Sequence, residues 1–88
     1  MNPGDPSIAR AAIVEAVENQ LKENNPPKVR KTLERLLASG MSRDEAINCI
    51  ASALSVEIFD AIKNVQAFNS QRYDRNLEKL PELPWESN

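Results

Sequence analysis

The sequence has 88 residues, which suits one domain with a modest hydrophobic core. Its formal net charge is −2, and it contains one cysteine, Cys49, and no histidine. These counts exclude an internal disulfide, a zinc site built from Cys and His ligands, and a nucleophilic centre that depends on histidine. No apolar run approaches the ~18 residues of a membrane span, and the N-terminus lacks a signal-peptide pattern. We therefore expect a cytoplasmic protein without metal or cofactor.

The N-terminal part of the chain predicts one long helix. Residues 1–5 form an irregular lead, and Asp5 and Ser7 are both suitable N-caps. Apolar residues then recur at helical spacing, which predicts a helix over about residues 6–24. The apolar positions of this helix are Ile8, Ala12, Ile13, Ala16, Val17 and Leu21.

A proline pair separates this helix from the next. Pro26 and Pro27 cannot continue the first helix but are tolerated in the first turn of a second, for which Asn25 is the expected N-cap. The second helix runs to about Ser39, where Gly40 supplies a left-handed C-terminal residue. Its expected buried side chains are Val29, Leu33, Leu36 and Leu37.

The third helix begins with a capping box and is the central one. Ser42 and Glu45 have the spacing at which each side chain bonds the backbone N–H of the other residue, and Met41 is placed to pack on Ala46. The helix is expected to end near Asn64. Its main apolar stripe comprises Ile47, Ile50, Leu54, Ile58, Ala61, Ile62 and Val65.

A fourth, shorter helix follows, with Asn69 as N-cap and Phe68 packed on Tyr73. Pro81 stops it, and residues 81–88 form an irregular C-terminal tail. Its Trp85 either packs on the bundle, which is favoured, or stays exposed as a linear motif. The fold class is therefore all-α. We expect a single domain, residues 1–88, formed by a compact bundle of three main helices, a short fourth helix and the tail.

The glycine corner before Ser42 admits a DNA-binding helix-turn-helix as one interpretation. The helix after the corner presents Arg43 and Asn48 but also Asp44 and Glu45, which suit a polyanion poorly. The second helix is locally basic, and weak nucleic-acid binding through it is the alternative function. A solvated helix face explains the same charges more simply. The basic residues concerned are Lys28, Arg30, Lys31 and Arg35.

Residues 36–54 also share a short pattern with ubiquitin-associated domains. Those domains have three short helices, whereas the first and third helices here span about five turns each. We favour a plain helix–helix corner, ended by Gly40 and restarted by the capping box.

Two polar residues fall within predicted apolar stripes. Gln20 lies in the stripe of the first helix and Glu57 at the edge of the stripe of the third. They form either a buried polar pair or ligands for something small, but hydrogen bonds to other buried polar groups or helix ends are the favoured expectation. Cys49 is expected to behave as a small buried hydrophobe rather than a reactive thiol.

The segments "LKENNPPKVRKTLERLLASGMSRDEAINCIASALSVEIFDAI" and "FNSQRYDRNLEKLP" resemble a family of small uncharacterised bacterial helical proteins. The shared features are an N-x-P-P-x-V helix start, a glycine corner followed by Glu-Ala, and a Glu-Ile pair at Glu57-Ile58. Members often carry histidine at the position of Asn48, which argues against a metal role in this chain. The resemblance implies a helical domain and no particular activity.

No phosphate-binding glycine loop, nucleophile–base pair or metal set is found, so we expect no catalytic residues and no enzyme activity. The expected function is a protein-interaction module whose partner is another protein or a second copy of the chain. A monomer is favoured over a homodimer, because the fourth helix or the tail needs a face on which to pack. The candidate interaction surface lies along one face of the third helix and comprises Asn48, Ser52, Ser55 and Phe59.

Overall fold

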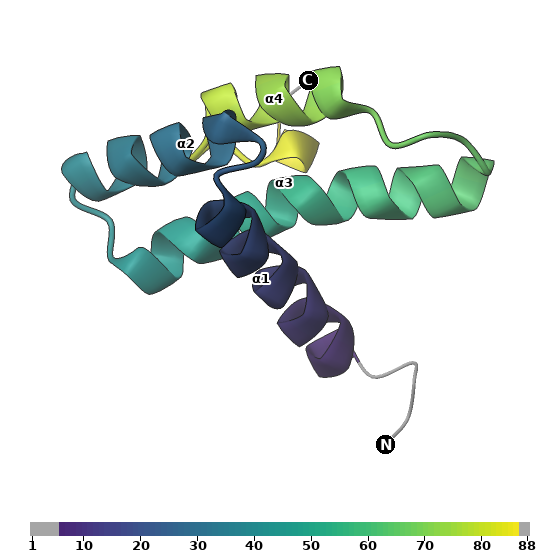
Figure 1. Ribbon diagram of the computed structural model, residues 1–88, viewed down its shortest axis with the longest axis horizontal. Helices are drawn as coiled ribbons and strands as arrows, with labels where there is room; N and C mark the ends of the chain where they lie inside the picture. The colour runs from purple at the N-terminus through teal and green to yellow at the C-terminus, as the bar shows by residue number, and fades with distance from the viewer. Residues whose placement is uncertain (1–5, 87–88) are drawn as a thin grey trace.

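The computed structural model describes residues 6–86, which form four α-helices and a short 3₁₀ helix (Figure 1). The predicted irregular lead, residues 1–5, lies outside the described residues, as do residues 87 and 88. This arrangement confirms the predicted all-α bundle with a short fourth helix. The elements are α1 (Pro6–Glu23), α2 (Pro27–Ala38), α3 (Arg43–Asn64), α4 (Ser70–Lys79) and η1 (Pro84–Glu86).

The α1–α2 connection differs from its prediction at one residue. The expected N-cap Asn25 is wrong, because the N-cap of α2 is Pro26, which offers no side-chain hydrogen bond. The backbone N–H of Asn25 instead donates to the carbonyl of Gln20 at 3.0 Å and so closes the end of α1. Asn24 reverses the chain in the left-handed region, with φ 53°, where asparagine is tolerated better than most residues.

The corner between α2 and α3 forms as the sequence predicts. Gly40 has φ 103°, and the next N–H, that of Met41, donates to the carbonyl of Leu36. The hydroxyl of Ser42 accepts from the backbone N–H of Glu45 at 3.1 Å, and the Glu45 carboxylate accepts from the backbone N–H of Ser42 at 3.0 Å. The capping box is confirmed, and it satisfies two N–H groups that the start of α3 would otherwise leave free.

Helix α4 also begins as predicted. The Asn69 side chain accepts from the backbone N–H of Arg72, and the ring of Phe68 meets that of Tyr73 edge to face at 5.7 Å. The tail then makes a 3₁₀ turn in which the backbone N–H of Leu83 donates to the Glu86 carboxylate. Leu83 packs on the core, whereas Trp85 is 61% exposed, so the predicted packing of Trp85 is wrong.

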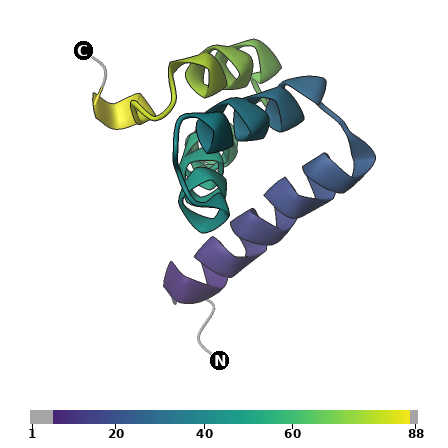
Figure 2. The ribbon, with the colours of Figure 1, turned by 90° about the vertical axis from the view of Figure 1, so that its left-hand side faces the viewer.

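The core is built around α3. Figures 1 and 2 show α2 and α4 on one side of α3 and α1 crossing it obliquely on the other. The C-terminal end of α3 projects beyond the remaining helices along the long axis of the molecule (Figure 1). Among the described residues, no helix has both the length and the apolar character that a membrane crossing requires. The buried apolar residues are Val17, Leu21, Val29, Leu36, Ala46, Ile47, Ile50, Ala51, Ala53, Leu54, Tyr73, Leu77 and Leu80.

One partly buried hydrogen bond joins helix α1 to helix α4. Tyr73 of α4 is 1% exposed, and its hydroxyl donates to the side-chain oxygen of Gln20 in α1 at 2.8 Å. Burial raises the pKa of Tyr73 above its usual value, because the ionised phenolate would be poorly solvated there. The bond links the C-terminal half of α1 to α4.

We predict that Ser42→Ala lowers the free energy of unfolding by about 1 kcal/mol, because α3 loses its N-cap hydrogen bond. Ser42→Asp keeps an acceptor at the same position and is the matched control, with a stability close to that of the parent. Denaturant unfolding followed by circular dichroism measures both. Equal stability of Ser42→Ala and the parent would contradict the role of the cap.

We also predict that Tyr73 ionises only when the protein unfolds in alkali. Its folded pKa is raised, so the stability it contributes is present below its ordinary pKa of about 10 and is lost as the pH rises above it. The chain has one tyrosine, so tyrosinate absorbance reports on this group alone. Absorbance and circular dichroism should change together. A reversible titration near pH 10 with unchanged helix content would contradict the buried placement.

Candidate functional site

An open groove of about 270 Å³ lies between the N-terminal half of α1 and the middle of α3. Helix α1 supplies one wall, and small residues of α3 form much of the rest. All four residues of the predicted interaction surface, Asn48, Ser52, Ser55 and Phe59, line it together with Ala9, Arg10, Ile13 and Ala51.

The groove has few hydrogen-bonding groups that a bound molecule would have to satisfy. The hydroxyl of Ser52 donates to the backbone carbonyl of Asn48 at 3.0 Å, and the hydroxyl of Ser55 donates to that of Ser52 at 2.8 Å. Both serine hydroxyls therefore donate their hydrogen bonds within α3. The atoms that these two serines present to the groove are small and largely apolar. Small side chains let another helix approach closely.

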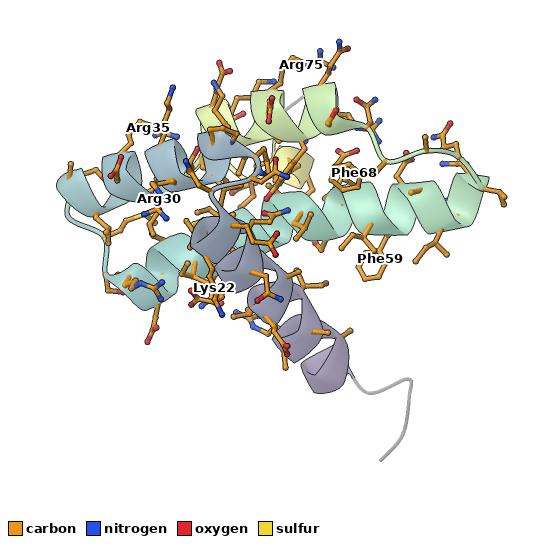
Figure 3. All side chains as sticks on the ribbon, viewed as in Figure 1. Lys22, Arg30, Arg35, Phe59, Phe68 and Arg75 are labelled. Atoms are coloured by element: carbon orange, nitrogen blue, oxygen red, sulfur yellow. The ribbon has the colours of Figure 1, made fainter. Side chains whose placement is uncertain are left out.

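Large apolar side chains continue from the groove to the free end of α3. Phe59 is 55% exposed, Ile62 69% and Val65 91%. The expectation that α4 or the tail covers Phe59 is wrong, because Phe59 projects from the side of α3 that faces away from α4 (Figure 3). A monomer was expected because α4 or the tail would pack on the face of Phe59. Since neither does, this reason for expecting a monomer no longer holds. We call Phe59 and Ile62, which lies one helical turn further along α3, together with the groove, the uncovered face.

Helix α4 is held on the other side of α3 by a cluster of charges. The buried Glu57 carboxylate accepts from the guanidinium of Arg72 at 2.8–3.0 Å, and Asp60 accepts from the same guanidinium at 2.7 Å. The bond from Arg72 lowers the pKa of Asp60, and the Gln66 amide adds to the effect. The stability that Asp60 contributes is therefore present above its ordinary pKa and is lost as the pH falls below that value.

Gln20 and Glu57 do not pair with each other. Each instead bonds a residue of α4, Gln20 meeting Tyr73 and Glu57 meeting Arg72. Both polar side chains therefore have hydrogen-bond partners, as expected. The two bonds join α4 to α1 and to α3.

Most of the basic residues of α2 are occupied within the protein. Lys28 pairs with Glu78 at 2.9 Å, Arg30 donates to the carbonyl of Leu21, and Arg35 donates to the carbonyl of Leu80 at 2.8 Å. Lys31 is exposed and forms no ion pair within residues 6–86. The residues predicted for nucleic-acid contact therefore mainly link α2 to neighbouring segments of the chain.

Cys49 is partly buried against the core, as expected of a small hydrophobe. Burial raises the pKa of its thiol, and the carboxylates of Glu45 and Glu86 act in the same direction. A reactive cysteine has a lowered pKa instead. Within residues 6–86, no group of three Asp, Glu or Cys side chains is arranged to hold a metal ion.

Comparison with known proteins adds no further constraint. No family model matches the sequence, and no curated protein or solved structure shows significant similarity to it. The resemblance to small bacterial helical proteins therefore stays an expectation, and function is argued from the geometry alone.

Part of the uncovered face was not predictable from the sequence. Ile62 has the spacing of the apolar stripe of α3, and no residue of α1 was expected to form a wall of the groove. The difference in length between the third helix and the fourth was a usable signal, since a short helix cannot cover a long one.

We predict that Arg72→Leu lowers the free energy of unfolding by about 2 kcal/mol, because it leaves the buried Glu57 carboxylate without its partner. The double variant Glu57→Leu/Arg72→Leu should recover most of that loss, since no charge then remains buried. Lys28→Leu breaks an exposed pair and is the control, with little change expected. A double variant no more stable than Arg72→Leu would contradict this account.

Proposed function

We propose that the protein is a non-enzymatic interaction module that binds another polypeptide through the uncovered face. The observation that carries the proposal is the exposure of Phe59, which is 55% accessible at the edge of an apolar groove. A large aromatic side chain beside a groove is the usual form of an interface anchor. Exposed apolar residues that gather in one place are typical of interaction sites.

The shape and chemistry of the groove favour a helical partner. Its walls are two helices, and its serine hydroxyls are already bonded within α3. A helix whose apolar side chains recur every three or four residues can fill such a groove without leaving polar groups unpaired. The wall residue Arg10 adds a positive charge that suits a negatively charged group of the partner, such as a helix C-terminus.

The other parts of the proposal come from the sequence. A chain without histidine and with one cysteine has no histidine-activated nucleophile and no Cys/His metal site, which supports a role in binding. We place this role in the bacterial cytoplasm, on the family resemblance and the single cysteine. Nucleic-acid binding through α2 is less favoured, since Lys28, Arg30 and Arg35 are engaged within the protein.

The test is site-specific photo-crosslinking in cells that contain the protein. A photoreactive phenylalanine derivative replaces Phe59, and the control carries it at Leu37, which is 40% exposed on α2. We expect a discrete adduct from position 59 alone, and we expect Ile62→Asp to abolish it. The absence of an adduct at position 59, or equal adducts at both positions, would contradict the proposal.

A further inference from the structure

We propose that residues 65–69, which connect α3 to α4, form a hinge at which two copies of this chain exchange α4 and the tail. In the exchanged dimer the connection is helical, so that α3 and α4 merge into one long helix. Each α4 then packs on the core of the other copy, at the site that it occupies in the monomer. This inference is independent of the proposed function, because α4 lies on the side of α3 away from Phe59 (Figure 3).

The connection is strained at its first residue. Val65 ends α3 in the left-handed region, with φ 49° and ψ 53°. A β-branched residue is a clear outlier in this region, because its side chain crowds the backbone, and such a conformation raises the energy of the monomer. If α3 continues as a helix through Val65, this residue takes ordinary helical angles and the strain is relieved.

No residue of the connection prevents a continuous helix. The connection contains neither proline nor glycine, and the first proline after it is Pro81, beyond the end of α4. All of its side chains are exposed, so little packing is lost when it changes conformation. The N–H of Arg72, which the Asn69 side chain caps, gains a backbone partner instead. The bond from Gln66 to Asp60 is lost, but both groups are then solvated by water.

The ion pair that holds α4 also shows where a two-fold axis would pass. Helix α4 runs back along α3 in the monomer (Figure 1), and two merged helices related by a two-fold axis are likewise antiparallel. The bond from Arg72 to Glu57 can therefore form between copies with the same geometry. Asn64 and Val65 lie midway between these two residues in the sequence. The axis thus passes at the hinge itself, as an exchange at this connection requires.

One stripe of the merged helix faces the other copy. Its residues recur at spacings of three or four, which places them within about 80° of arc on a continuous helix. Val65 is 91% exposed and Phe68 43% exposed in the monomer, where the turn interrupts this stripe. In the exchanged dimer both side chains lie between the two antiparallel helices, close to the axis, and are buried there. The stripe comprises Glu57, Ala61, Val65, Phe68 and Arg72.

The exchanged α4 finds the same partners in the second copy as in its own. Tyr73 bonds Gln20, and the carbonyl of Leu80 accepts from Arg35. Because the two copies have one sequence, the exchange leaves the energy of these bonds unchanged. The relief of strain and the buried hinge favour the dimer, whereas the lost freedom of two molecules opposes it. The dimer therefore forms at high concentration, and it forms slowly because α4 must first leave its own core.

Refolding of the full chain at high and low concentration, followed by size-exclusion chromatography with light scattering, tests the hinge. The parent should yield a dimer of twice 9.8 kDa, in a fraction that rises with concentration. Val65→Gly should lower the dimerisation constant about tenfold or more, since glycine adopts left-handed angles without strain and weakens the merged helix. Val65→Ile keeps the β-branched side chain and is the control, with the parent's constant expected. Deletion of Gln66 and Ala67 should give a dimer at every concentration, because the shortened connection cannot turn back.

A pair of charge-reversed variants separates exchange from side-by-side association. Glu57→Arg and Arg72→Glu each place like charges at the contact between α3 and α4, so each variant alone should be destabilised. Refolded together, they should form a heterodimer that is more stable than either variant, because each α4 then meets a core of opposite charge. In a side-by-side dimer the like charges would remain together within each copy.

Three results would overturn the exchange. They are a parent that stays monomeric after refolding at every concentration, a deletion variant that stays monomeric, and a mixture of the charge-reversed variants that is no more stable than either alone. If Glu57→Arg does not fold by itself, the mixture still decides, since the exchanged heterodimer restores its contact with α4. None of these results bears on the proposed function, because Phe59 lies outside the hinge.

Discussion

The length of α3 is the constraint on which the rest of the structure depends. Its 22 residues span about 33 Å at 1.5 Å per residue, close to the 36 Å long axis of the molecule. Helices α2 and α4 have 12 and 10 residues, or about 18 and 15 Å. Neither helix alone can cover α3 from end to end, and the two lie beside each other on the same side of α3. The apolar stripe of α3 is therefore buried at Ile47 and Ile50 and open to solvent at Ile62.

Two polar contacts decide which side of α3 stays open. The ion pair of Glu57 with Arg72 and the hydrogen bond of Gln20 with Tyr73 both hold α4 on one side of the bundle. Both contacts are buried on at least one partner, so moving α4 to the opposite side would strand polar groups in the core. The side with Phe59 is left to α1 alone, and α1 crosses it obliquely. The uncovered face thus stays open because Glu57 and Gln20 find their hydrogen-bond partners in α4 on the other side of α3.

Local signals made most of the fold predictable. The capping box at Ser42, the left-handed Gly40 and the cap at Asn69 each depend on a few neighbouring residues, and all three form as expected. The wrong predictions concern Asn25, Trp85 and the covering of Phe59, and also the burial of Leu37, Ile62 and Val65. All of these depend on where separate segments meet in space. The four residues of the candidate surface line one groove, because helical spacing alone puts them on one face. The sequence did not reveal α1 as the second wall, since periodicity says nothing about crossing angles.

The central claim is that the side of α3 around Phe59 stays open to solvent because polar contacts hold α4 on the opposite side. Line broadening by a soluble paramagnetic gadolinium chelate, measured on the side chains of the isotope-labelled protein, tests it residue by residue. The account predicts strong broadening at Phe59 and Ile62 and weak broadening at Ile50 and Leu77. Equal protection of Phe59 and Ile50 would contradict it.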